Sequence, residues 1–184
     1  MSETKKQSFN DAVKKLFKRY FIDAMGAMAL GLFATLLMGT ILDTIGKYIP
    51  ISWLSACLCE AASFAKGASG MAIGVAIAYS LKSDPLVLFS CAVVGSASYS
   101  MGTTIALSSG AEIAYTAGPA GVFFAAIIAA ELGRLVSKKT KIDILVTPAV
   151  TILSGYIVAK LICPAIAYLM YYLGSFINTA TEMR

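Results

Sequence analysis

The chain has 184 residues, of which 58% are hydrophobic and 14% are charged, and its formal net charge is +5. Soluble domains usually carry about a quarter charged residues, so this composition excludes an ordinary water-soluble surface. The chain contains no histidine, which excludes a phosphohistidine relay, a histidine-ligated metal site and a serine–histidine–aspartate triad.

The charged residues are unevenly distributed along the chain. Of the 25 charged residues, 16 lie in residues 1–19, 131–143 and 182–184. Residues 24–42 contain no ionisable group, and a helix of about 20 apolar residues crosses a bilayer core of about 30 Å. The sequence therefore predicts an all-α fold, a polytopic transmembrane helical bundle of about five spans within a membrane domain over residues 20–184.

Residues 1–19 form a basic leader that precedes the membrane domain. Phe9, Val13 and Phe17 recur at helical spacing among lysines and arginines. This pattern is typical of an amphipathic helix on an anionic membrane surface, and a solvated leader is the alternative. The leader is too polar for the apolar region of a signal peptide, so we expect it to remain attached.

The predicted spans follow one another between charges, turns and prolines. They are residues 20–45, 68–81 with a broken entry from residue 53, 85–98, 119–136 and 144–163. The last apolar run continues to Thr181 and is too long for one straight span, which predicts a kink or break at Cys163–Pro164. Residues 164–180 would then form an interfacial or further helix.

Two segments are rich in small or hydroxyl-bearing residues. Gly70, Gly74 and Ala78 place small side chains on one helix face, which allows another helix to approach closely. Residues 99–119 are rich in Gly, Ser and Thr. We interpret them as a re-entrant or cavity-lining element, with an ordinary external loop as the alternative.

The distribution of lysine and arginine predicts an orientation. If spans one to four each cross once, the N-terminal cluster, Lys82 and residues 134–141 fall on one side. Lys47, Lys66 and Lys160 fall on the other side. Basic residues accumulate on the cytoplasmic side of membrane proteins, so we expect a multi-pass protein with a cytoplasmic N-terminus.

Ionisable residues within membrane segments are candidates for function, because inserting one costs about 2.5 to 3.5 kcal/mol. The candidates are Asp23, Glu60, Lys66, Glu112, Glu131 and Lys160. Some of them also fit span ends, and Glu131 is three residues from Arg134 and can pair with it. Glu60 and Glu112 are the stronger candidates, since they lie in broken or glycine-rich segments that could bind a polar solute.

Glycines and hydroxyls complete the candidate substrate-binding set. The run TAGPAG at 116–121 opens a predicted helix, whose free amides suit hydroxyl or anionic groups, although Gly-Pro is also an ordinary helix start. The candidate residues are Glu60, Thr103, Thr104, Glu112, Thr116, Gly118 and Gly121. We predict no catalytic residue, metal site or cofactor, and the cysteines lack the paired spacing of a structural metal site.

Three stretches carry a resemblance to a known family: KRYFIDAMGAMALGLFATLLMGTIL, DPLVLFSCAVVG and, above all, AGPAGVFFAAIIAAELGRLVSKKTKIDILVTPAVTILSG. From about Phe17 onward the chain resembles the IIC-like membrane family of the phosphotransferase system, EIIC type 2, which includes regulators of the PfoR type. The resemblance implies a component of bacterial sugar uptake in the cytoplasmic membrane, through which a sugar passes to a separate phosphorylating subunit. It also implies that the chain has no phosphoryl donor of its own, in agreement with the missing histidine.

The resemblance further implies a longer protein. Its members continue into a second hydrophobic half beyond the position that matches INTATEMR. We therefore expect the chain to be the N-terminal half of a two-part protein, a self-assembling half or a truncated chain.

Three functions are compatible with the sequence. The first is a permease component that forms part of a sugar pathway, and the second is a membrane-embedded regulator or scaffold without transport activity. An intramembrane enzyme is the weakest, since no nucleophile–base pair or metal cluster is visible. The expected partners are membrane lipid, a sugar, separate IIA and IIB subunits and a second copy of the chain in a two-fold dimer, with no nucleic acid. The small-residue face at Gly70, Gly74 and Ala78 is one surface that could pair with itself.

Overall fold

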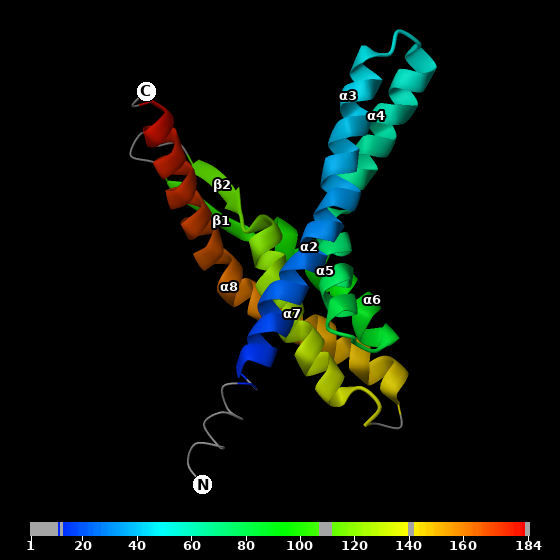
Figure 1. Cartoon of the computed structure of the whole chain (residues 1–184), viewed down its shortest axis with the longest axis vertical. Helices are drawn as coiled ribbons and strands as arrows, with labels where there is room; N and C mark the ends of the chain where they lie inside the picture. The colour runs from blue at the N-terminus through cyan, green and yellow to red at the C-terminus, as the bar shows by residue number, and fades with distance from the viewer. Residues whose placement is uncertain (1–10, 12, 107–111, 140–141, 183–184) are drawn as a thin grey trace.

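The computed structural model describes residues 11, 13–106, 112–139 and 142–182. Helices make up most of this part, and a two-stranded sheet interrupts them (Figure 1). Within the described residues, three helices are long and apolar enough to cross a membrane, or four if the bent pair Ser52–Gly67 and Ser69–Ser80 is one span. The predicted helical membrane bundle is confirmed, and its span count is approximate.

The described chain begins with one long helical segment, Val13–Tyr48, of 36 residues. It comprises a π-helical stretch Lys18–Asp23, α2 (Ala24–Leu32), a second π-helical stretch Phe33–Leu37, and α3 (Met38–Tyr48). At 1.5 Å per residue the segment is about 54 Å long, more than the bilayer core of about 30 Å. The segment ends where Ile49, the residue before Pro50, adopts an extended conformation, as residues before proline prefer.

The chain then returns along α3 and enters the bundle. Helix α4 (Ser52–Gly67) packs beside α3, and α5 (Ser69–Ser80) follows it after a bend of 49°. Residues 53–81, expected as a broken entry followed by a span, thus form two helices with a bend between them. Helix α6 (Pro85–Ser100) begins with a proline in its first turn, where the missing N–H has no helical partner to lose.

Two further helices complete the chain. Helix α7 covers Gly118–Val136, and α8 covers Asp143–Glu182 with Pro148 and Pro164 inside it. The sequence predicts a kink or break at Cys163–Pro164, and α8 is one continuous helix through this position. Membrane helices tolerate proline where neighbouring helices support the backbone, and Cys163 is buried 3.6 Å from the Ser98 carbonyl oxygen of α6.

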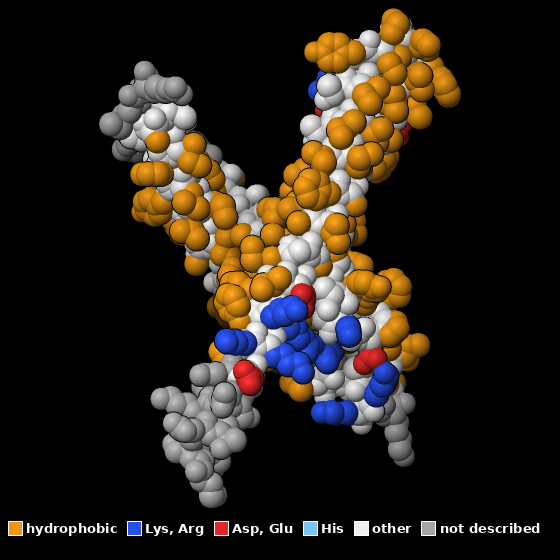
Figure 2. Space-filling view, viewed as in Figure 1, with side chains coloured by type: hydrophobic (Ala, Val, Ile, Leu, Met, Phe, Trp, Pro, Cys, Tyr) orange, Lys and Arg blue, Asp and Glu red, His pale blue; other side chains and the backbone are white. Residues whose placement is uncertain are grey.

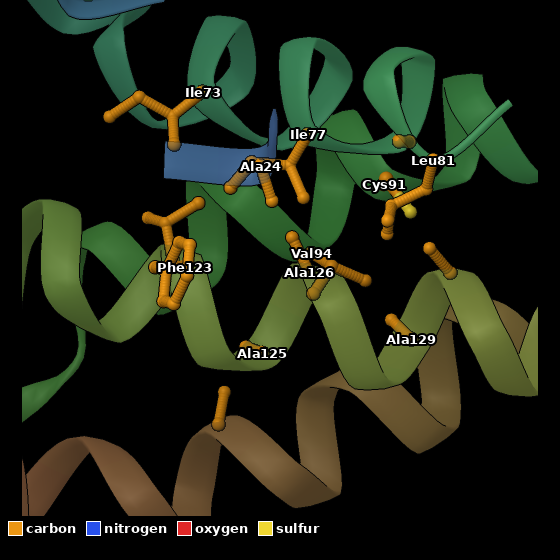
Figure 3. Packing of buried hydrophobic residues seen from close by; sticks show 14 of the residues in the cluster. Ala24, Ile73, Ile77, Leu81, Cys91, Val94, Phe123, Ala125, Ala126 and Ala129 are labelled. Carbon is orange, nitrogen blue, oxygen red and sulfur yellow. The ribbon is translucent and has the colours of Figure 1, made fainter. Parts of the chain in front are cut away.

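The core lies where α2, α5, α6, α7 and the first part of α8 meet. Figure 3 shows Ile73 and Ile77 of α5 and Leu81, the residue after α5, across the core from the alanines of α7. These three side chains are at most 1% exposed. Alanine on α7 allows close helix approach, as small residues do in membrane bundles.

The small-residue face of α5 packs against α6 inside the chain. A Cβ atom at Gly74 would lie 2.2 Å from the carbonyl oxygen of Cys91, and one at Gly95 would lie 2.2 Å from that of Gly70. Ala78 is fully buried. The expectation that this face pairs with a second copy is therefore wrong, because α6 already covers it.

Two parts of the molecule project from the bundle in different directions (Figure 1). One is the α3–α4 hairpin and the other is the C-terminal part of α8 with the sheet beside it. Hydrophobic side chains cover both projections (Figure 2), including Trp53, which is 77% exposed, and Phe176, which is 71% exposed. In a membrane protein such surfaces contact lipid or another polypeptide.

Candidate functional site

Two β-strands, which we call the β-hairpin, lie within residues 99–119, the segment expected to be a re-entrant or cavity-lining element or an external loop. Strands β1 (Gly102–Ala106) and β2 (Glu112–Thr116) pair antiparallel, with Thr103 opposite Tyr115. Threonine, isoleucine and tyrosine favour strands, and these residue types form much of both strands. The hairpin lies against α8, where the ring centroids of Tyr115 and Tyr171 are 5.3 Å apart. Residues 102–106 and 112–116 thus form regular antiparallel structure packed on α8.

A cavity of about 390 Å³ opens beside this hairpin. Five of its seven lining residues carry a hydroxyl group; the lining residues are Ser100, Gly102, Thr103, Thr104, Ala114, Tyr115 and Thr116. Thr104 and Thr116 are exposed, while Thr103 and Tyr115 are partly buried. Because each hydroxyl both donates and accepts hydrogen bonds, this lining is chemically suited to a polyhydroxy ligand. We call it the hairpin pocket.

Three predicted site residues line the hairpin pocket, namely Thr103, Thr104 and Thr116. Sequence reasoning missed Ser100 and Tyr115, which line it as well. The alternation of β-branched and aromatic residues around Tyr115 was the available signal for a strand. The Gly, Ser and Thr residues around these strands obscure that signal, because they also fit a re-entrant element or a loop.

The two predicted glycines lie behind the hairpin pocket and are buried. Gly118 has a φ of +53°, a left-handed conformation that glycine adopts without strain. A Cβ atom at Gly121 would lie 2.5 Å from the Cβ atom of Ala117 and 3.0 Å from the Sγ atom of Cys163. Structure alone therefore explains both glycines: Gly118 permits the turn into α7, and Gly121 permits the close packing of α7.

The two predicted glutamates are not brought together by one copy of the chain. Glu60 is exposed on α4, in the projection opposite the sheet (Figure 1). The backbone of Glu112 pairs with Ala106, and its side chain lies outside the described part of the structure. In the described part of the chain, no three His, Cys, Asp or Glu side chains are grouped so that they could hold a metal ion.

Basic residues gather at the end of the bundle away from the sheet (Figure 2). Arg19 Nη2 donates to Glu131 Oε1 at 3.1 Å and to the Leu81 carbonyl oxygen at 3.0 Å. Arg134 Nη1 donates to the same Glu131 oxygen at 3.1 Å, which confirms the predicted pairing of Glu131 with Arg134. The third partner, Arg19, is 112 residues away in sequence and could not be predicted by helical spacing.

A second charged cluster joins two turns at this same end. Ser137 Oγ donates to Asp84 Oδ2 at 2.9 Å, and Lys138 Nζ donates to Asp84 Oδ1. The hydrogen bond from Lys138, followed by that from Ser137, holds the pKa of the Asp84 carboxyl below its usual value. These contacts connect the α5–α6 turn to the end of α7.

The charges in the α3–α4 hairpin neutralise one another. Asp43 Oδ2 accepts from Lys47 Nζ and from Lys66 Nζ, each at 3.0 Å. Lys66 belongs to α4, so its pair with Asp43 crosses between the two helices. Pairing lowers the cost of placing ionisable groups in an apolar environment, which gives Lys66 a structural role.

The model of one protein family, described as "Phosphotransferase system, EIIC", matches residues 22–184. This range contains the bundle, both projections and the hairpin pocket. No curated protein and no solved structure matches the chain.

Proposed function

Because the chain belongs to the phosphotransferase system EIIC family, we propose that it is the membrane permease component of a phosphotransferase-type sugar uptake system. The observation that carries this proposal is the hairpin pocket. Its volume of about 390 Å³ falls in the range of about 300–1,000 Å³ typical of small-molecule sites. Its hydroxyl lining suits the hydrogen-bonding groups of a sugar.

The proposed pathway needs a second wall. Thr103, Thr104 and Thr116 line the hairpin pocket, and Gly118 and Gly121 lie at the start of α7. Glu60 and Glu112 come close together only if the α4 helix of another polypeptide lies near the β1–β2 strands of this chain. A second copy of the chain, or a second half of the protein, would do this, as in carriers that build their site between repeats.

Orientation follows from the basic end of the bundle. Lys18, Arg19, Lys82, Arg134 and Lys138 all lie there, and we place this end in the cytoplasm of a bacterial cell. The hairpin pocket then faces the outside, and separate IIA and IIB subunits would meet the basic end. In a variant without native cysteines, we expect a cysteine at residue 139 to react only from the cytoplasmic side and one at residue 52 only from outside.

Sugar binding is the direct test of the proposal. The purified full chain in lipid nanodiscs is titrated with a panel of hexoses, pentoses, hexitols and disaccharides, and the heat of binding is measured. We expect one class to bind, and Thr103→Val or Tyr115→Phe to weaken it about two- to twelvefold, since one hydrogen bond contributes about 0.5–1.5 kcal/mol. Thr40→Val on α3, an exposed site outside the pocket, is the matched control.

If no sugar class binds to the wild-type protein, the permease proposal fails. The alternative, a membrane-embedded regulator or scaffold, would then be favoured. If a sugar binds but Thr40→Val weakens it as much as Thr103→Val does, the site lies elsewhere.

Assembly is tested separately by the mass of the full chain in mild detergent, corrected for bound detergent, and by crosslinking in native membranes. We expect a two-fold dimer, the commonest closed arrangement of identical chains. A monomer in both measurements would contradict self-assembly.

A further inference from the structure

A basic pocket of about 410 Å³ lies at the charged end of the bundle. Five cationic side chains line it, namely Lys15, Lys18, Arg19, Lys82 and Arg134. The carboxylates present are Asp23, which lines the pocket, and Glu131, which pairs with both arginines. The pocket therefore keeps an excess of positive charge after these acids are counted.

The pocket is partly preorganised. Arg19 is fixed by the carbonyl oxygen of Leu81 and by Glu131. Lys82 has a φ of +54°, a conformation that ordinary residues seldom adopt, and it lines the pocket from the turn after α5. Cationic side chains from three separate parts of the chain thus converge on one space.

A nearly apolar groove of about 660 Å³ runs along the outer face of α5. It follows α5 from Ala68 to Tyr79, and Leu30 of α2 and Leu88 of α6 flank it. Eleven residues of helix rise about 16 Å, which is close to half of a bilayer core of about 30 Å. The groove therefore has the length of one membrane leaflet.

The basic pocket and the groove adjoin each other through shared lining residues. A third cavity, of about 420 Å³, is lined by Tyr79, Ser80, Lys82 and Ser83. It shares Ser80 and Lys82 with the basic pocket and Tyr79 with the groove. Tyr79 is 75% exposed, and amphipathic rings of this kind favour the level where membrane meets water.

We infer that this surface is a binding site for one anionic phospholipid, with its phosphate in the basic pocket and an acyl chain in the groove along α5. The excess positive charge matches an anionic headgroup, and basic pockets between membrane helices are suited to such headgroups. The adjoining groove is what selects a lipid over free phosphate, which has no apolar part. The inference depends on the membrane location of the chain and is independent of sugar transport.

The test is native mass spectrometry of the full chain released from mild detergent, with phosphatidylglycerol or phosphatidylcholine of identical acyl chains. We expect one phosphatidylglycerol to be retained and phosphatidylcholine to be lost. The Lys18→Gln/Lys82→Gln variant should bind phosphatidylglycerol roughly 30-fold more weakly, since each basic side chain near a membrane surface contributes about a fivefold factor. Lys139→Gln, an exposed lysine at the same end that does not line the pocket, should bind normally.

A separate variant tests whether an acyl chain binds in the groove. Ala76→Phe fills it and should reduce retention of phosphatidylglycerol, whereas Val93→Phe on α6, which is 50% exposed and outside the groove, should not. The lysine variants keep the test valid if Ala76→Phe does not fold.

Two competitors separate the sources of phosphate. Inorganic phosphate and glycerol phosphate, added at the concentration of the lipid, should not displace it. Equal retention of both lipids, displacement by either soluble anion, or equal effects of Lys139→Gln and the double variant would each overturn the inference.

Discussion

The α5–α6 pair and the α3–α4 pair are built in the same way but have different surroundings. In both pairs glycine allows a close approach: Gly74 meets the backbone of α6, and Gly46 lies against Cys59 of α4. The α5–α6 pair is enclosed by α2, α7 and α8, and its inward side chains are buried. The α3–α4 pair projects alone, with Tyr48 84% exposed and Trp53 77% exposed.

This difference distinguishes the bundle, which contacts within the chain stabilise, from the α3–α4 hairpin, which also needs contacts with lipid or another protein. Other helices of the same chain bury the inward faces of α5 and α6, so we expect the stability of the bundle to depend mainly on contacts within the chain. Within the described residues, the α3–α4 hairpin is held mainly by the interface between its two helices and by the Asp43 ion pairs. Its outer faces require lipid or protein contacts, so its stability should respond to the environment more than that of the bundle.

The largest expected effect is that of Gly74→Leu in the bundle. The added side chain would collide with the Cys91 carbonyl oxygen, which cannot rotate away. We expect a cost of about 3 kcal/mol or more and a melting temperature in detergent lowered by about 10 °C. Gly26→Leu is the matched control, because nothing lies within 4 Å of its Cβ position. Equal melting temperatures would show that α5 and α6 are not in close contact.

The next effect, from Gly46→Leu, should stay within the α3–α4 hairpin. Its Cβ atom would lie 2.8 Å from the Cys59 Sγ atom and 3.2 Å from the Leu58 Cβ atom. We expect hydrogen exchange to accelerate in α3 and α4 and to stay unchanged in α5, α6 and α7. Faster exchange throughout the bundle would contradict the independence of the two regions.

A smaller effect is expected where Arg19 joins the first helix to α7. The side chains of Arg19 and Glu131 are 35% and 33% exposed, so solvent screens their attraction. A double-mutant cycle with Arg19→Gln and Glu131→Gln should give a coupling free energy of about 1 kcal/mol in thermal unfolding. A coupling of zero would mean that apolar packing alone holds the first helix to the bundle.

The smallest effect concerns pH and the Asp84 cluster. The pKa of Asp84 is lower in the folded protein than its usual value, which is about 3.9 in unfolded chains. The contribution of Asp84 to stability is therefore complete above about pH 4, and it is lost as the pH falls through the lower folded pKa. Its side chain is 29% exposed, so the change should be small. Unfolding of Asp84→Asn should lack this component, and identical acid profiles for both proteins would contradict the assignment.

Several candidate site residues could be predicted from the sequence, but which of them lie together in space could not. Thr103, Thr104 and Thr116 could be selected because they lie in residues 99–119, a segment rich in Gly, Ser and Thr whose hydroxyls can bind a polar solute. Tyr115 could have been added from strand propensity. The position of Glu60 relative to the β1–β2 strands could not be predicted, because it depends on the direction in which α3 and α4 leave the bundle.

The sequence by itself determined that this chain is a helical membrane protein. Its long uncharged runs have the length of membrane-spanning helices, and a helix pairs its backbone N–H and C=O groups internally, as the lipid environment requires. It also determined the start of α6 and α7, since proline positions act locally. Only the tertiary structure decided that the small-residue face of α5 packs on α6 within the chain, that α8 passes through Pro164, and that Arg19 meets Glu131. Each of these depends on which helices become neighbours, and that choice is made by the packing of distant segments, which local spacing does not encode.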